Sequence, residues 1–207
     1  MANPVCFQSL EEEMRGIVPY MGGRLLNIGC GDADLTGFIK ANSPTAMVVN
    51  ADIATSLPDG VICSIFDLPF ADQTFDSVLC NAVLEHVPQP FTAVAELDLV
   101  LKPGGRLLLC VPFLQPFHAS PTDYFRYTAA GLRALCPDTY EVAHLQTVHC
   151  MAQTIGWLVW EFVNEKGGRL RKALVWPWIW LFTRLFQGTD LNTTRSANGF
   201  QMVLIKR

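Results

Sequence analysis

Short, nearly continuous apolar runs alternate with amphipathic segments along most of this chain, and this alternation restricts the fold more than any other feature. The runs SVLC and RLLLCV show no alternation of polar and apolar residues, which is typical of strands buried on both faces. Strands separated by helices in this way form parallel sheets, because a parallel pair needs a long crossover connection. The sequence therefore predicts an α/β fold, with a mostly parallel sheet and helices on both faces.

The boundaries of these elements follow from the apolar periodicity and the turn residues. The pattern predicts strands at 24–28, 46–51, 61–66, 75–81, 106–111, 141–148 and 199–205. It predicts helices at 8–21, 34–41, 90–101 and 129–136. The turn at 102–105, KPGG, ends one helix and starts the next strand. A chain of 207 residues, 50% of them apolar, is long enough for one domain with a sizeable core.

Charge and cysteine content exclude several functional classes. The net charge of −4 argues against a nucleic-acid partner, because binding to the phosphate backbone relies on clustered Lys and Arg. The seven cysteines are scattered, and no two have the spacing of a metal site, so neither a disulfide framework nor a metal is expected. The start of the chain is acidic and has no apolar signal core. A cytoplasmic protein with reduced cysteines is therefore expected.

The segment LLNIGCGDADL, at 25–35, predicts a nucleotide-binding loop. Gly29 and Gly31 stand between a strand and a helix, where a ligand meets the helix N-terminus. A dinucleotide fingerprint needs a third glycine at position 34, but the chain has Asp34, preceded by Asp32. Two carboxylates repel a pyrophosphate, which disfavours NAD and FAD. They favour a positively charged nucleoside such as S-adenosylmethionine, although both aspartates could instead cap the helix.

Several further motifs follow in order along the chain. They read VVNADIA, FDLPFADQTFDSVLCNAVLEHVPQP, AELDLVLKPGGRLLLCVPF and SANGFQMVLIKR. Together with LLNIGCGDA they resemble class I S-adenosylmethionine-dependent methyltransferases, most closely a small bacterial subgroup of methyltransferase type 11. The resemblance is good over about 25–128. It implies a Rossmann-like fold, with a seven-stranded, mostly parallel sheet, an antiparallel last strand and helices on both faces.

The resemblance also implies how the chain is organised. We expect a single methyltransferase domain over 1–207, with the cofactor-binding core at about 22–112. An acceptor side and a Trp-rich helical insertion follow at about 113–190, and the final strand is expected at about 199–206. The implied cofactor is S-adenosylmethionine, which becomes S-adenosylhomocysteine on methyl transfer.

Individual residues receive cofactor roles from the resemblance. Gly29 and Gly31 let the backbone approach the amino-acid end of the cofactor. Asp52 accepts hydrogen bonds from both ribose hydroxyls, a task for which a carboxylate is suited. Asp67 meets the adenine amino group, and Asn81 lines the cofactor and faces the acceptor. The full predicted cofactor-binding set is Asn27, Gly29, Cys30, Gly31, Asp52, Ile53, Asp67, Leu68 and Asn81.

The chain departs from the family pattern at three places. Asn27 stands where the family usually has an acidic residue, and Ala33 stands where it has a third glycine. Asp32 or Asp34 could supply the missing charge. Only about fourteen residues separate Asp52 from Asp67, so the usual intervening helix is expected to be short or absent. Asn27 and Ala33 leave open a non-catalytic protein that binds S-adenosylmethionine or S-adenosylhomocysteine.

The segment PFLQPFHASPTDYFRYT, at 112–128, is expected to cover the acceptor. The candidate catalytic residues are His118, Asp123 and His86, and the candidate substrate contacts are Tyr124, Arg126 and Tyr127. Methyl transfer from a sulfonium depends mainly on alignment, and it needs a base only when the acceptor carries a proton. The expected acceptor is a small molecule, a glycan or a lipid-linked compound with an oxygen or nitrogen nucleophile.

A structural alternative exists for the same segment. Ser120 has the character of a helix N-cap, with Pro121 at the first helical position and Asp123 at the third. In that interpretation Asp123 stabilises the start of a helix. Thr128 would then cap the helix that follows.

Residues 151–187 differ from the rest of the chain, because they hold all five tryptophans around the basic segment GGRLRK. Two apolar helices are expected, at 151–163 and 173–186. The second is too short to span a bilayer, and Pro177 is expected to break it. The insertion could be a lid or pocket wall, a peripheral contact with the inner membrane face or a lipid substrate, or a dimer interface. Monomer and homodimer both remain open.

Overall fold

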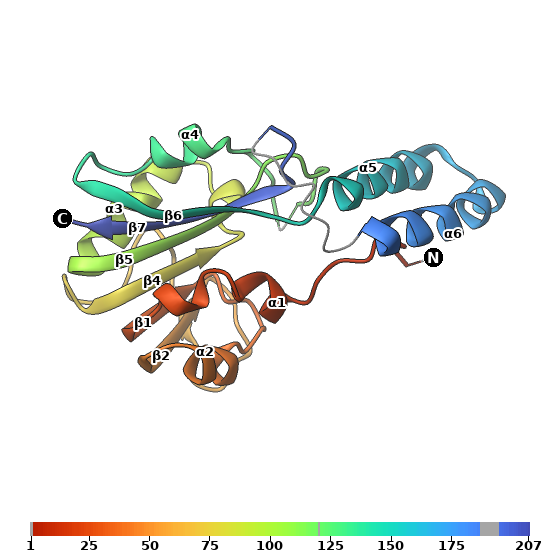
Figure 1. Ribbon diagram of the computed structural model, residues 1–207. Helices are drawn as coiled ribbons and strands as arrows, with labels where there is room; N and C mark the ends of the chain where they lie inside the picture. The colour runs from red at the N-terminus through yellow and green to blue at the C-terminus, as the bar shows by residue number, and fades with distance from the viewer. Residues whose placement is uncertain (1, 120, 187–194) are drawn as a thin grey trace.

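The computed structural model describes residues 2–119, 121–186 and 195–207, which form a seven-stranded sheet with helices around it (Figure 1). The strand order is β3-β2-β1-β4-β5-β7-β6, and β7 runs antiparallel to both of its neighbours. The strands are β1 Gly23–Ile28, β2 Thr45–Asp52, β3 Val61–Ile62, β4 Phe75–Asn81, β5 Leu101–Pro112, β6 Tyr140–Val148 and β7 Gly199–Lys206. The predicted fold class, including the antiparallel last strand, is confirmed.

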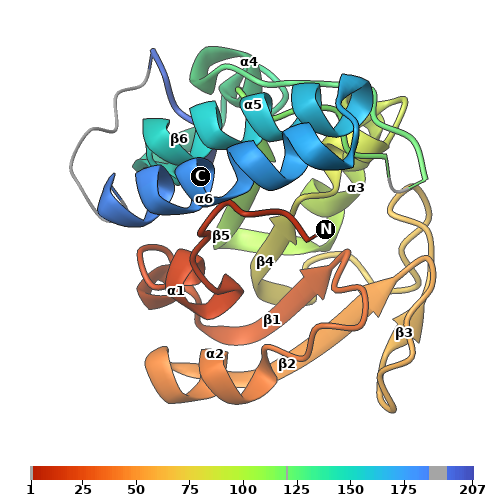
Figure 2. The ribbon, with the colours of Figure 1, turned by 90° about the vertical axis from the view of Figure 1, so that its right-hand side faces the viewer.

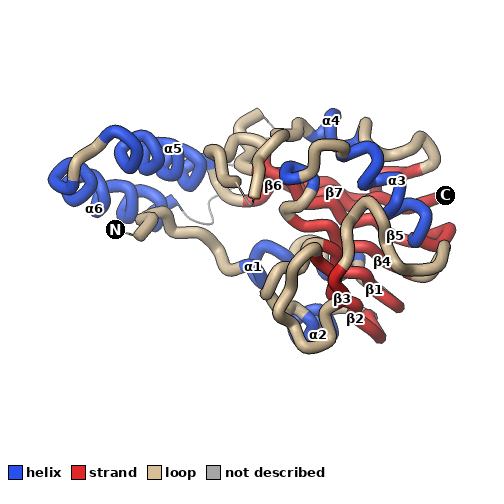
Figure 3. Tube along the Cα trace, turned by 180° about the vertical axis from the view of Figure 1, so that it is seen from behind, coloured by secondary structure: helices blue, strands red, loops and turns tan. Residues whose placement is uncertain are grey.

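Helices pack on both faces of the sheet (Figure 3). One face carries α3 and α4, and the other carries α1, α2 and a short 3-10 helix, η1. Successive residues of a strand point to opposite faces, so Leu25 and Leu26 of β1 belong to different core layers. The bounds are α1 Leu10–Met14, η1 Val18–Tyr20, α2 Thr36–Asn42, η2 Leu84–His86, α3 Pro90–Val100 and α4 Ala129–Arg133.

The predicted helix at 8–21 is wrong, because the structure divides it into α1 and η1. Ser9 caps α1 through a capping box with Glu12. The helix ends within two turns because Gly16 destabilises its continuation and Pro19 lacks the N–H that another helical turn needs.

Two strand boundaries differ from the prediction by more than two residues. β3 is shorter than expected, because the chain turns at Ser64, whose carbonyl accepts the Asp67 N–H. β5 begins earlier than expected, at Leu101, which pairs with Phe75 of β4. The register then shifts before the Arg106 pairing, so the KPGG turn is a bulge within β5.

The Trp-rich insertion forms a hairpin of two helices, α5 Met151–Lys166 and α6 Arg169–Phe186, which we call the α5–α6 hairpin. It extends beyond the sheet at the end opposite the C-terminus (Figure 1). The prediction that Pro177 breaks the second helix is wrong, because α6 continues through it. Pro177 and Ala173 are both exposed, so the Ala173 carbonyl, which loses its helical partner, can face solvent.

Residues 2–9, which we call the amino-terminal segment, hold the α5–α6 hairpin against the sheet. Figure 2 shows this amino-terminal segment running along α6 toward α1. The Cys6 N–H donates to the Thr183 hydroxyl at 3.1 Å, and Gln153 donates to the Cys6 carbonyl at 2.7 Å. Val5 packs between Trp160 of α5 and Ile179 of α6. In the part of the chain that the structure describes, no helix has the length and hydropathy to cross a membrane.

Candidate active site

The loop after β1 places its two glycines in conformations that other residues rarely adopt. Gly29 has φ +74° and Gly31 has φ +53°. A β-carbon at Gly29 would overlap the Val83 side chain, whereas one at Gly31 would meet nothing within 4 Å. The fold therefore requires the first glycine, and the second borders open space where a ligand can approach the backbone.

Asp52 ends β2 and reaches across to this loop. One of its oxygens accepts the Gly31 N–H at 2.8 Å, and the other accepts the Ala54 N–H at 2.9 Å. Each carboxylate oxygen has a second lone pair, so both can still accept a hydroxyl of a bound sugar. Ile53, the next residue, is 75% exposed beside it.

The aspartates that disfavoured a dinucleotide hold the loop in place. Asp34 accepts the N–H of Thr36, the first residue of α2, at 2.9 Å. The N-cap of α2 is Leu35, so the alternative that the two aspartates cap this helix is wrong. Asp32 accepts the N–H and the hydroxyl of Ser56, both at 2.7 Å. These hydrogen bonds lower the pKa of both carboxyls. Asn27 is buried, and its amide donates to Asn50 of β2 rather than to the glycine loop.

The expected absence of a helix after Asp52 is confirmed, since residues 53–74 form only loops and the short β3. Asp67 is exposed here, while Leu68 and Cys30 are buried. The Cys63 N–H donates to the Asp52 carbonyl at 2.9 Å, and the next residue, Ser64, is bridged to Asp67. Burial, and after it the charge of Asp52, raises the pKa of the Cys63 thiol. The structure thus brings the predicted ribose and adenine residues to one side of the sheet edge.

Asn81 is the last residue of β4, and the chain turns sharply after it. Ala82 has φ +54°, an uncommon value for a residue with a side chain, and its N–H donates to the Cys110 carbonyl at 3.0 Å. Strained backbone of this kind concentrates at functional sites. The turn leads directly into η2 and so places Glu85 beside Asn81.

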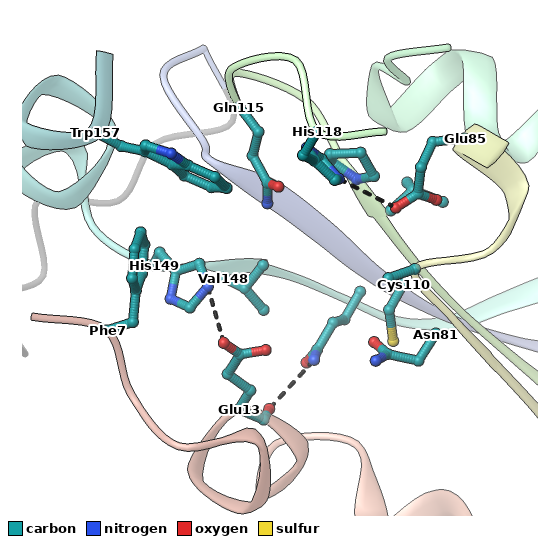
Figure 4. A pocket seen from close by; sticks show the side chains of 14 residues that line it. Phe7, Glu13, Asn81, Glu85, Cys110, Gln115, His118, Val148, His149 and Trp157 are labelled. Atoms are coloured by element: carbon teal, nitrogen blue, oxygen red, sulfur yellow. Dashed lines mark hydrogen bonds and ion pairs between the residues drawn. The ribbon is translucent and has the colours of Figure 1, made fainter. Parts of the chain in front are cut away.

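A cavity of about 230 Å³ opens beside Asn81, at the carboxyl ends of β4 and β5 (Figure 4). Its lining comes from segments far apart in the sequence: the amino-terminal segment, α1, η2, the loop after β5, α5, and the strands β4, β5, β6 and β7. Sequence reasoning placed Asn81 and His118 here and missed Phe7, Glu13, Glu85, Gln115, His149 and Trp157. The only signal for Glu85 was its position four residues after Asn81.

Glu85 is fully buried, and among the described residues neither of its carboxylate oxygens has a hydrogen-bond partner. Its Oε1 atom lies 3.9 Å from Nε2 of His86 and 3.9 Å from Nε2 of His118. The facing carboxylate raises the pKa of His118. A negative charge and two imidazoles therefore meet at one end of the cavity.

Asp123 and Arg126 fix the loop that carries His118. Asp123 accepts the His118 N–H at 2.8 Å and pairs with the Arg126 guanidinium. Arg126 also donates to the carbonyls of Gln115 and Pro116, at 3.1 and 2.8 Å. The guanidinium lowers the pKa of Asp123 to about 2. The N–H groups of Arg126 thus bond within the loop, and they position His118 rather than face a substrate.

The other acceptor-side residues lie around the same loop. Tyr127 is buried and its hydroxyl donates to the Leu84 carbonyl at 2.9 Å, while Tyr124 is 49% exposed. The alternative of a helix starting at Pro121 is wrong, because residues 121–128 contain no helix; Ser120 lies outside the described residues. The Asp123 carboxylate bonds to Arg126 and His118 instead. The predicted cap at Thr128 is confirmed by its bond from the Gly131 N–H.

Comparisons with known proteins agree with this geometry. A family model described as a methyltransferase domain matches residues 26–109. The ubiquinone/menaquinone biosynthesis C-methyltransferase UbiE of Burkholderia mallei is 30% identical over 182 residues, covering 71% of this chain and 72% of the relative.

Two solved structures show the same fold. One is the 1,6-didemethyltoxoflavin-N1-methyltransferase of Burkholderia thailandensis with 1,6-didemethyltoxoflavin and S-adenosylhomocysteine bound (TM-score 0.59, 15% identity, 95% of this chain and 78% of that chain). The other is an S-adenosylmethionine-dependent methyltransferase of Archaeoglobus fulgidus (TM-score 0.58, 15% identity, 95% and 93%).

A mostly parallel sheet with a glycine loop after β1, an acidic residue at the end of β2 and a cavity after β4 is typical of α/β proteins that bind a nucleotide or nucleoside. This chain belongs to the class I S-adenosylmethionine-dependent methyltransferases. Its cofactor is S-adenosylmethionine. The open space at Gly31 and the unused lone pairs of Asp52 suit that cofactor, whose sulfonium makes the methyl group transferable.

Replacing Gly29 with alanine should abolish measurable binding of S-adenosylhomocysteine. The new β-carbon would overlap Val83 and occupy a positive φ, which displaces the loop from the cofactor. Gly37→Ala is the matched control, because Gly37 lies in α2 with nothing within 4 Å of an added β-carbon. Calorimetric titration of both folded variants tests this, and normal affinity in Gly29→Ala would contradict it.

Proposed function

We propose that this enzyme transfers a methyl group from S-adenosylmethionine to an oxygen or nitrogen atom of a lipid-linked acceptor bound in the cavity beside Asn81. The observation that carries the proposal is the position of that cavity. It lies between Asn81, at the carboxyl end of β4, and Trp157 of the apolar α5–α6 hairpin. The lining combines polar and aromatic groups: Trp157 stacks on His118, at 6.0 Å between ring centroids, and packs edge-on against Phe7.

The cofactor would lie along the carboxyl ends of β1, β2 and β4. In this proposal the Gly29 and Gly31 backbone contacts its amino-acid end, and Asp52 accepts the ribose hydroxyls. Asp67 contacts the adenine amino group. The remaining predicted residues line the same path: Cys30, Ile53, Leu68 and Asn81. Asn27 contributes by joining β1, the strand before the loop, to β2 through Asn50.

The reacting atom of the acceptor would lie near Glu85, His86 and His118. These groups favour loss of its proton, and the in-line displacement at the sulfonium otherwise needs only alignment. Asp123 and Arg126 act through His118, whose loop they hold. Tyr124 and Tyr127 border this loop.

The surface of the α5–α6 hairpin supports a lipid-linked acceptor. Leu170 and Trp178 are each 73% exposed. Further large apolar side chains are exposed around them: Leu158, Phe162, Leu174, Leu181 and Leu185. Arg169, Arg171 and Lys172 lie at the start of α6. Tryptophan and basic residues on an apolar helix are typical of segments that lie in a membrane interface.

Purified protein should therefore co-sediment with vesicles that contain anionic lipid, and less so with neutral vesicles or at high salt. Arg169→Glu/Arg171→Glu should weaken this association at least about tenfold, since each basic residue near an anionic surface contributes about 1 kcal/mol. Arg15→Glu/Lys40→Glu makes the same charge change at exposed positions of the sheet domain and should have little effect. Equal loss in both variants would contradict the assignment to the hairpin.

The function itself is tested in two stages. Calorimetric titration with S-adenosylhomocysteine, with NAD as the control, should show binding of the first alone. Incubation with S-adenosylmethionine carrying a radioactive methyl group should then label an organic-phase lipid extract. Label only in a water-soluble extract would contradict the lipid-linked acceptor. Cofactor binding without any transfer would favour a non-catalytic protein.

A further inference from the structure

We propose that Glu85, His86 and His118 bind a divalent transition-metal ion, such as Zn²⁺, with open coordination positions that face the acceptor cavity. Cysteine spacing in the sequence predicted no metal, and this set contains no cysteine. The binding of the ion stands on the geometry below. Its use on the acceptor rests on the proposed function.

The ligand atoms of Glu85, His86 and His118 already lie close to one another in the structure. One ligand atom from each lies within 4.8 Å of the other two, and Glu85 Oε1 is 3.9 Å from both Nε2 atoms. Ligand atoms of a tetrahedral zinc site, with bonds of about 2.0–2.1 Å, lie about 3.4 Å apart. Movements of less than about an ångström therefore complete the site. Two histidines and one carboxylate form a ligand set used for Zn²⁺ and Fe²⁺.

The second nitrogen of each imidazole fixes which atom faces Glu85. His86 Nδ1 lies 2.7 Å from the Thr122 carbonyl, and His118 Nδ1 lies 2.9 Å from the Pro116 carbonyl. A carbonyl only accepts, so Nδ1 carries the hydrogen in each ring and Nε2 presents a lone pair. Histidines that bind metals show this same donation from the other ring nitrogen.

Arg126 does not change this assignment for His118. Its Nη2 atom lies 3.3 Å from Nδ1. The same atom makes shorter bonds, of 2.8 Å to the Pro116 carbonyl and 2.6 Å to Asp123. Its two hydrogens are therefore accounted for.

The burial of Glu85 makes a bound cation favourable. An ionised carboxylate that is fully buried and lacks hydrogen bonds is costly, and a cation held between it and two lone pairs removes that cost. The surrounding backbone is held in place, because the Glu85 carbonyl accepts the Tyr124 N–H at 2.7 Å and Tyr127 bonds to Leu84. The Glu85 carboxylate and the two Nε2 atoms each present a lone pair, and a metal ion can accept all three.

The ion would meet the acceptor directly. The His118 side chain is 30% exposed and, with Glu85, lines the cavity, so the remaining coordination positions open into it. A hydroxyl bound there loses its proton to solvent more easily. The oxygen lone pair then forms the bond to the methyl carbon as the carbon–sulfur bond breaks, and its electron pair stays on the sulfur of S-adenosylhomocysteine.

The test uses full-length protein stripped of metal with a chelator, and Zn²⁺ and Co²⁺ as probes. Equilibrium dialysis should give one Zn²⁺ per chain, with a Kd below about 10 μM. The Co²⁺ form should show visible bands of nitrogen and oxygen ligands and no thiolate charge-transfer band. His118→Ala and Glu85→Ala should each weaken binding at least about 100-fold, more than the loss of an outer hydrogen bond does. His144→Ala, which removes a histidine stacked on Tyr20 outside the cavity, should not.

Binding of S-adenosylhomocysteine checks that each variant is folded and tests the cofactor site separately. Zn²⁺ binding that is absent, or equal in wild type and His118→Ala, would overturn the proposal and leave a proton shared by Glu85 and His118. Metal binding with no transfer to any lipid extract would keep the site and remove the proposed acceptor instead. If the ion acts on the acceptor, chelation should abolish transfer and added Zn²⁺ should restore it.

Discussion

Replacing Asp52 with alanine should weaken binding of S-adenosylhomocysteine at least about 100-fold while the protein remains folded. The carboxylate has one lone pair on each oxygen for a ribose hydroxyl, and hydrogen bonds to charged groups contribute about 1.5–3 kcal/mol each. The substitution also removes the acceptor of the Gly31 N–H and so loosens the cofactor loop. Calorimetric titration measures the affinity, and circular dichroism measures the fold.

Two further variants make this result specific. Asp59→Ala removes the same charge from an exposed position in the loop that follows Asp52, and it should leave the affinity within about twofold, as expected for a surface substitution. Asp52→Asn keeps the shape and one acceptor oxygen, so its affinity should fall between those of wild type and Asp52→Ala. Unchanged affinity of folded Asp52→Ala for S-adenosylhomocysteine would contradict the assignment of Asp52 to the ribose.

Replacing Arg126 with methionine should lower the free energy of unfolding by about 2–4 kcal/mol, because it leaves Asp123 buried without its partner. The Asp123 side chain is only 2% exposed. The carbonyls of Gln115 and Pro116 lose donors as well. Urea unfolding at neutral pH measures the loss. Binding of S-adenosylhomocysteine should be nearly unchanged, since the loop at 113–127 does not contain the cofactor residues.

The same pair gives a pH dependence with a defined sign. The folded-state pKa of Asp123 is depressed to about 2, so its contribution is complete above its unfolded value and is lost as the pH falls through about 2. The stability difference between wild type and Asp123→Asn should therefore shrink between about pH 4 and pH 2. In Arg126→Met/Asp123→Asn the two losses should not add. Additive losses would contradict a direct Asp123–Arg126 interaction.

The sheet could be predicted from the sequence because its information is local. The predicted bounds of β4, 75–81, are correct, because a polar turn precedes its apolar residues and Asn81 follows them. The glycine loop and Asp52 follow from their places at strand ends. The hydrogen-bond partners of the glycine loop were harder to predict from the sequence. Asp32 and Asp34 bond to Ser56 and Thr36 through geometry that the chain adopts only when folded.

The acceptor cavity could not be predicted in the same way. Its walls come from segments far apart in the sequence, and the burial of Glu85 arises only where η2 meets the loop that carries His118. Local propensity also failed where packing decides the outcome. Val175 and Trp176 of α6 pack in one cluster with Val5 and Trp160, and the helix that carries them continues through Pro177.

The amino-terminal segment contacts both the α5–α6 hairpin and the acceptor cavity, and so couples the two. Phe7 packs edge-on against Trp157, at 5.2 Å between ring centroids, and against His149, at 5.0 Å. The residue before it is hydrogen-bonded to both hairpin helices. A ligand that shifts the hairpin thus shifts two cavity walls, and thermodynamic reciprocity requires equal effects in both directions. If contacts of the hairpin change the affinity for the acceptor by some factor, the bound acceptor changes the affinity of the hairpin for its contacts by the same factor.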